Sequence, residues 1–288
     1  VLKSGRTHLM DATPVMLGQA FHGWARQVKL GMERLEKASS ELAELALGGT
    51  ATGTGINTHP EFARKAIQRI NEETGLVFSE AANHFEAQGA KDGAVSASGI
   101  LNTLAVSLTK ITDDIRWLAS GPTAGLQEIT LPAVQPGSSI MPGKVNPVMS
   151  EALMMVAARV MGNHTTITIA GSRGHLELNA MMPVMAFALL ESMEILAGGC
   201  RAFTQRCVVG IEANVERCRE LLEKNPSLAT ALNFRIGYDL AAEVAKEAAQ
   251  TGKSVREVVR TRGLIPEEEL EQLLDVRGMT EGGRGEGG

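Results

Sequence analysis

The sequence predicts an all-α fold, in which a bundle of long helices carries polar loops and a small helical domain follows toward the carboxyl end. Two observations predict it. Apolar or small residues recur in alternating steps of three and four over four long stretches, which is typical of helices packed in a bundle. Beyond residue 210 the sequence changes to short, charge-rich amphipathic segments. We expect a central bundle with polar loops over 1–209, a helical domain over 210–275 and a flexible tail over 276–288.

The first long helix is predicted to begin after a short polar loop at residues 3–12. Thr13 can cap a helix, and Pro14 suits the first helical position because proline lacks a backbone N–H. The apolar seam continues to Gly48 and Gly49, where two glycines end it after about 33 residues, or roughly 50 Å.

Three further seams predict the remaining long helices, over residues 97–118, 149–170 and 182–207. Helices of about 25 to 33 residues exceed the globular average of about eleven or twelve, which favours a long bundle. Small residues in the seams favour close packing against partner chains, so we expect a homo-oligomer. A shorter helix is expected over 60–74, and the one expected strand lies within 126–131.

Composition and charge place the chain among globular proteins. Its 288 residues, 44% of them hydrophobic, can bury a sizeable core. The net charge of 28 − 33 = −5 gives no general attraction to nucleic acid or anionic membranes. No run approaches about eighteen uncharged apolar residues and no signal peptide is evident, so we expect a cytoplasmic protein. The six histidines show no ligand spacing with one another or with cysteine, so no metal is expected.

A polar stretch at residues 137–151 runs straight into the third seam and reads Gly-Ser-Ser-Ile-Met-Pro-Gly-Lys-Val-Asn-Pro-Val-Met-Ser-Glu. Asn146 followed by Pro147 is a helix-start signal. The free N–H groups of a helix start, together with the charge of Lys144, predict an anion-binding site. These residues alone leave open an ordinary capped surface loop. The spacing argues against a nucleotide P-loop, because five residues instead of four separate the glycines and Val145 follows the lysine.

Three other polar segments hold candidate residues. Thr7 and His8 lie in the amino-terminal loop, residues 50–60 alternate glycine with threonine, and His175 and Glu177 separate the third and fourth seams. A helix connector and a polar kink are the alternatives for the last two segments. Periodicity does not say which of these loops meet.

Two of these stretches resemble signatures of the fumarase/aspartase superfamily. Gly-Ser-Ser-Ile-Met-Pro-Gly-Lys-Val-Asn-Pro is similar to its signature sequence, and Gly-Arg-Thr-His-Leu-Met-Asp-Ala resembles its second motif. With Gly-Thr-Gly-Ile-Asn-Thr-His-Pro-Glu and Ile-Gly-Tyr-Asp, the resemblance to class II fumarate hydratases extends to about Met279. His8, where the similar aspartases carry glutamine, and the pair His59-Pro60 favour the fumarase branch. An aspartate ammonia-lyase and a non-catalytic helical scaffold are the alternatives.

The resemblance implies reversible anti hydration of fumarate to L-malate, a step of the tricarboxylic acid cycle, without metal or organic cofactor. Ser138 matches the base proposed for the family. His8, oriented by Glu151 as its partner, is the candidate acid, base or water-holder, because histidine titrates near neutral pH. The residues expected to bind substrate or stabilise the aci-carboxylate dianion are Thr7, Ser139, Lys144 and Asn146.

The resemblance also implies a homotetramer whose active sites are shared between subunits. The family's first motif, an Asn- and Ser-rich substrate-binding segment, is absent from these residues, and the chain begins with Val1 instead of methionine. We therefore expect that an amino-terminal piece is missing and that this chain alone has little or no activity. Neither nucleic acid nor a membrane is expected as a partner.

Overall fold

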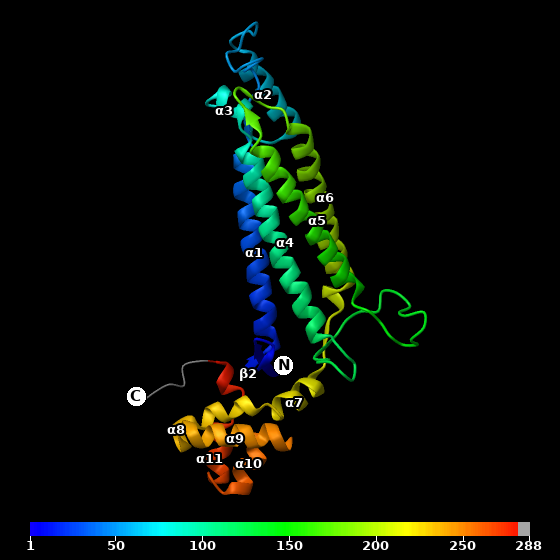
Figure 1. Ribbon diagram of the computed structural model, residues 1–288, viewed down its shortest axis with the longest axis vertical. Coiled ribbons are helices and arrows are strands. Elements are labelled where there is room, and N and C mark those ends of the chain that lie inside the picture. The colour runs from blue at the N-terminus through cyan, green and yellow to red at the C-terminus, as the bar shows by residue number, and fades with distance from the viewer. Residues whose placement is uncertain (282–288) are drawn as a thin grey trace. The chain divides into compact units, whose positions relative to one another are not determined.

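The computed structural model describes residues 1–281 and divides into two compact units (Figure 1). The first unit comprises Val1–Ala25, Trp117–Thr130 and the chain from Ile211 onward, and the second comprises Arg26–Arg116 and Leu131–Gly210. The boundary expected near residue 210 coincides with the point where the second unit ends, at Gly210, and the first unit resumes, at Ile211. The unit that follows it also includes two earlier segments, because the amino-terminal strands pack against the carboxyl-terminal helices.

The second unit is built on long helices that run side by side (Figure 1). They are α1 (Leu17–Glu41, whose first residues belong to the first unit), α4 (Asp92–Leu118), α5 (Val148–Gly171) and α6 (Met182–Arg206). The buried residues of α5 follow the predicted seam, among them Leu153, Val160 and Ile167. Those of α4 do the same, among them Leu101 and Ile115. The predicted long-helix bundle is confirmed.

Short elements complete the second unit. They are α2 (Phe62–Thr74), α3 (His84–Gly89), the 3-10 helix η1 (Val208–Gly210), the parallel pair β3 (Glu44–Leu45) and β4 (Ser79–Glu80), and the antiparallel pair β6 (Gly174–His175) and β7 (Leu178–Asn179). The polar segment that contains His175 is therefore a small hairpin between α5 and α6.

The first unit combines a hairpin with the carboxyl-terminal helices. Its strands are β1 (Leu2–Thr7) antiparallel to β2 (Met10–Met16), and β5 (Ile129–Thr130) antiparallel to β8 (Glu212–Ala213). Its helices are α7 (Val215–Glu223), η2 (Pro226–Leu232), α8 (Asn233–Ile236), α9 (Tyr238–Thr251), α10 (Val255–Arg262), α11 (Glu267–Leu273) and η3 (Gly278–Thr280). An apolar cluster centred on Leu232, Val244 and Val258 holds these helices together. The predicted small helical domain is confirmed in outline.

The amino-terminal expectations are wrong in two respects. Residues 2–16 form a hairpin instead of a polar loop, and α1 begins at Leu17 instead of Pro14. Pro14 lies in β2 opposite Ser4, beside an irregularity in the register, a position where a strand tolerates proline. The expected strand within 126–131 is present as β5, but the expectation that it would be the only strand is wrong, since residues 1–281 contain four two-stranded sheets. Distant segments supply the partners, which local periodicity does not reveal.

Part of the expected tail is folded. Gly278–Thr280 form η3, and Val276 and Met279 pack against the apolar cluster of the first unit. Residues 282–288 of the expected tail lie outside the described residues.

Two helical segments among residues 1–281 are long and apolar enough to cross a membrane by length and composition. They are Asp92–Leu118 and Met182–Gly210, of which 39% and 28% of the most apolar stretch is buried within the structure. Bundle helices pass the same test, so this evidence for a membrane span is weak. The absence of a membrane partner stays a prediction.

Candidate active site

The loop that precedes α5 closes on its own backbone. The N–H of Ser138 donates to the carbonyl oxygen of Lys144 at 2.9 Å, and the N–H of Lys144 donates to that of Met141 at 3.2 Å. Gly137 has a φ of 90°, which favours glycine, and a Cβ there would collide with the carbonyl of Lys144. These contacts fix the turn from residues within it.

The hydroxyl of Ser138 lies inside this turn. Its Oγ accepts the backbone N–H of Met141 at 3.1 Å and that of Ile140 at 3.3 Å. N–H groups aimed at an oxygen stabilise its negatively charged form more than its neutral form. Serine is a poor base because its alkoxide is costly to form, and this arrangement reduces that cost. Ser139 and Lys144 are exposed beside it.

The helix start differs from the expected cap. α5 begins at Val148, and its N-cap is Pro147, which makes no side-chain cap hydrogen bond. The carbonyl of Asn146 accepts the N–H of Val148 at 2.9 Å, and that of Pro147 accepts the N–H of Glu151 at 3.2 Å. The expected capping role of Asn146 is therefore wrong: its backbone carbonyl, instead of its side chain, accepts the N–H of Val148.

Glu151 lies in the first turn of α5. One Oε1–Nη2 distance of 4.0 Å separates it from Arg116 at the end of α4, and Arg116 also donates to Asp113 at 2.9 Å. The helix dipole and the guanidinium both place positive charge beside this carboxylate. Glu151 thus has a fixed neighbour within the second unit.

Thr7 and His8 lie where the β1–β2 hairpin reverses. Thr7 pairs with Met10, and His8 and Leu9 form the two-residue turn with φ of 56° and 60°. Positive φ at both central positions is typical of hairpin turns built from glycine or asparagine, and it costs a larger residue about 1–2 kcal/mol. Strain of this kind persists only where the surrounding structure holds it. Both Thr7 and His8 are exposed.

A buried charge cluster that the sequence did not predict lies beneath this hairpin. Glu128 is fully buried, and its carboxylate accepts two hydrogen bonds from Arg6, each of 3.0 Å. Lys3 Nζ lies 3.2 Å from the same carboxylate. The available signal was that Glu128 is the one charged residue in the stretch at 126–131.

The structure therefore groups the predicted residues into two sets. Thr7 and His8 belong to the first unit. The other set belongs to the second unit and lies on the loop before α5 and on the first turn of α5: Ser138, Ser139, Lys144, Asn146 and Glu151. The expected pairing of Glu151 with His8 stays a prediction.

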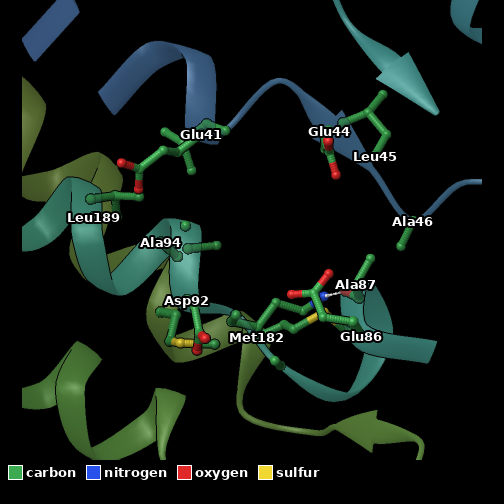
Figure 2. Close-up of a pocket in the computed structure, with 16 residues that line it drawn as sticks. Glu41, Glu44, Leu45, Ala46, Glu86, Ala87, Asp92, Ala94, Met182 and Leu189 are labelled. Carbon is green, nitrogen blue, oxygen red and sulfur yellow. Dashed lines mark hydrogen bonds between the residues drawn. The ribbon is translucent and has the colours of Figure 1, made fainter. Parts of the chain in front are cut away.

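A pocket of about 440 Å³ lies elsewhere in the second unit, where α1, α3, α4 and α6 come together. Figure 2 shows the carboxylates that surround it, those of Glu41, Glu44, Glu86 and Asp92. Lys91 lines it too; burial lowers the pKa of its amine, which donates to the carbonyl of Ala87. None of the predicted site residues lines the pocket, and its negative lining would repel a dicarboxylate.

Comparisons with known proteins agree along nearly the whole chain. The lyase family profile matches residues 1–162, and the fumarase C C-terminus profile matches residues 228–281. The class II fumarate hydratase of Mycobacterium tuberculosis (strain CDC 1551 / Oshkosh) is 53% identical over 284 residues, covering 97% of this chain and 60% of that protein. That of Neisseria meningitidis serogroup A is 53% identical over 274 residues, covering 95% and 59%.

Comparison with a solved structure agrees with these sequence similarities. The class II fumarase from Schistosoma mansoni superposes with a TM-score of 0.94 at 36% sequence identity, covering 98% of this chain and 62% of the other. The chain thus spans about 60% of the length of the relatives that it matches.

Proposed function

This chain belongs to the lyase family, in its class II fumarate hydratase branch, and on that premise we propose that the complete protein catalyses the reversible anti hydration of fumarate to L-malate. The structural observation that carries the proposal is the turn around Ser138. Two backbone N–H groups point at its hydroxyl, as the base of such a reaction requires.

In the dehydration direction, Ser138 removes a proton from the malate carbon that does not bear the hydroxyl, which carries one of the two carboxylates. The electron pair of the broken C–H bond moves into that carboxylate, which becomes an aci-carboxylate dianion. Such an intermediate is accessible only where positive charge and N–H dipoles surround it. Lys144 and Asn146, six and eight residues after Ser138, are suited to that role.

The malate hydroxyl leaves from the opposite face and needs a proton. We assign this task to His8, directly or through a water, because histidine exchanges protons near neutral pH. Glu151 would orient His8, and Thr7 and Ser139 would hydrogen-bond the substrate carboxylates. The expelled hydroxyl and the donated proton together make the released water, so the reaction balances.

We also propose that the complete protein is a homotetramer with shared active sites and acts in the cytoplasm, in the tricarboxylic acid cycle. Exposed apolar side chains support oligomerisation: Val184, Phe187 and Leu190, spaced by three on α6, are 37%, 64% and 65% exposed. A face of this kind is suited to burial against other copies. Light scattering of the complete protein should give a tetramer, whereas a monodisperse monomer would contradict the proposal.

The direct test follows the ultraviolet absorbance of fumarate when malate is supplied to the complete protein and, separately, to this chain. We expect activity in the complete protein and little or none in this chain. Faster consumption of aspartate than of malate would instead identify an ammonia-lyase. A complete, tetrameric protein inactive on both substrates would favour the scaffold alternative.

A further inference from the structure

The hairpin that carries Thr7 and His8 rests on the buried cluster of Lys3, Arg6 and Glu128. The side chains of Lys3, Arg6 and Glu128 are 6%, 13% and 0% exposed. Two cations share one carboxylate, so the cluster has a net charge of +1. Removing one partner from a buried ion pair is strongly destabilising, because it leaves the other charge without compensation.

Glu128 is itself fixed by its backbone. Its N–H donates to the carbonyl of Leu118 at 2.8 Å, and its carbonyl accepts the N–H of Asn214 at 2.9 Å. The thiol of Cys218 donates to the same carbonyl at 3.5 Å. The residue that follows, Ile129, pairs with Ala213 in the β5–β8 sheet. The carboxylate therefore projects from a fixed point toward the hairpin.

Arg6 connects the fixed carboxylate of Glu128 to the turn. It immediately precedes Thr7, and both of its Nη atoms bind Glu128. A two-point hydrogen bond between a guanidinium and a carboxylate sets orientation as well as distance, which a lysine at the same place cannot do. The next two residues after Thr7, His8 and Leu9, have the strained positive φ. A strained turn needs this kind of external constraint.

We propose that Glu128 is a positioning residue: through its two-point hydrogen bond with Arg6 it holds the Thr7–His8 turn in the conformation that catalysis requires. Lys3 is the second cation on Glu128. The catalytic part of this proposal rests on the proposed function, whereas the conformational part does not.

The test replaces Arg6 by lysine in the complete protein, which keeps the charge and removes the two-point hydrogen bond. The matched control is Arg260→Lys, which removes a similar two-point contact with Glu267 on the exposed surface of the same unit. Hydrogen exchange of the amides in residues 2–16 and the kinetic constants kcat and KM are measured for each protein.

For Arg6→Lys we expect the turn amides to exchange about tenfold faster and kcat to fall about 100-fold, with KM changed by less than about threefold. Arg260→Lys should match the wild type in all three. Equal exchange in Arg6→Lys and the wild type, or a kcat within about threefold of the wild type, would overturn the proposal. A wild type inactive on fumarate and malate would refute the proposed function alone, because exchange still reports on the turn.

A second variant covers the case in which Arg6→Lys does not fold. Glu128→Asp keeps all three charges of the cluster, but its side chain is one methylene shorter, so its carboxylate cannot keep both hydrogen bonds with Arg6 at their present length. We expect intermediate effects, with turn exchange raised by about threefold and kcat lowered by about tenfold. Wild-type values in this variant would refute a positioning role for Glu128.

Discussion

The loop at 137–144 and the hairpin at 2–16 carry the candidate catalytic residues by opposite means. The loop is closed by its own backbone, because the partners of Ser138 all lie within six residues of it. The hairpin depends on residues far along the chain, since Glu128 is 122 residues from Arg6 and Asn225 is 213 residues from Ala12. A local substitution should therefore disable the loop, whereas distant substitutions should loosen the hairpin.

The largest expected effect is at the loop hydroxyl. In the complete protein, Ser138→Ala should lower kcat by about 1000-fold with a modest change in KM, because a proton-transfer group is lost while most substrate contacts stay. Steady-state kinetics on malate measures this. Ser139→Ala, which removes the neighbouring exposed hydroxyl, should cost much less, and comparable losses in the two variants would remove Ser138 as the base.

Substitution of Gly137 and of Gly143, which both have positive φ, tests whether closure of the loop places Ser138. At Gly137 a Cβ collides with the carbonyl of Lys144, whereas at Gly143 it meets nothing within 4 Å. We expect Gly137→Ala to lower kcat by about 100-fold and Gly143→Ala by no more than about tenfold, from backbone strain alone. Equal losses would show that backbone closure does not place Ser138.

The hairpin is tested at Asn225, which is 1% exposed. Its amide donates to Ser4 Oγ at 3.0 Å and to the carbonyl of Ala12 at 2.7 Å, so it joins both strands to the carboxyl-terminal helices. Asn225→Ala leaves buried groups unpaired and should lower the free energy of unfolding by about 2 kcal/mol. Denaturant titration measures this. Ser227→Ala, which loses one exposed hydrogen bond, is the control and should cost less than about 1 kcal/mol.

The smallest expected effect is the pH dependence of the cluster beneath the hairpin. Burial lowers the pKa of Lys3 from its usual 10.5, although Glu128 opposes the shift. The folded protein therefore releases this proton at a lower pH than the unfolded chain does. The contribution of Lys3 to the free energy of unfolding thus rises with pH between the lowered pKa and 10.5.

Comparison with Lys3→Met isolates this contribution. The difference in unfolding free energy, wild type minus variant, should become more positive toward alkaline pH, by at most about 1.4 kcal/mol per pH unit. Denaturant titrations at neutral and alkaline pH measure it. Burial raises the pKa of all three cysteines. The effects of Cys200 and Cys207 cancel between the two proteins, but the charge of Lys3 lowers the pKa of Cys218, so both proteins should carry Cys218→Ala. A difference that is flat or falls with pH would contradict the burial argument.

The contrast between the loop, which is closed by nearby residues, and the hairpin, which is held by distant ones, also explains which features the sequence could predict. The seams of α4, α5 and α6 were recognisable because burial repeats along each helix, and the polar stretch before α5 stood out because its chemistry is contiguous. The hairpin was not recognisable. Thr13-Pro14 also reads as a helix start, and the pairing of Ser4 with Pro14 depends on tertiary contacts. The Asn-Pro pair also predicts a side-chain cap, which the structure lacks because the backbone carbonyl of Asn146 accepts the N–H of Val148.

Glu128 shows most clearly what could not be predicted from the sequence. In the sequence it is one glutamate among apolar and uncharged polar residues, and its role appears only when β1 places Arg6 and Lys3 beside it. No periodicity marks such a residue, because its partners lie more than 100 residues away. The candidate residues themselves were found by resemblance, and their grouping on one loop by local contiguity.

The central claim is that the complete protein adds water across fumarate with a single stereochemistry, and one measurement tests it directly. Fumarate is incubated with the complete protein in D₂O, and the malate formed is analysed by proton nuclear magnetic resonance. The account predicts malate with one deuterium on the carbon that does not bear the hydroxyl, placed by anti addition, as the coupling between the two remaining C–H protons reports. No conversion, or a mixture of both stereoisomers, would contradict it.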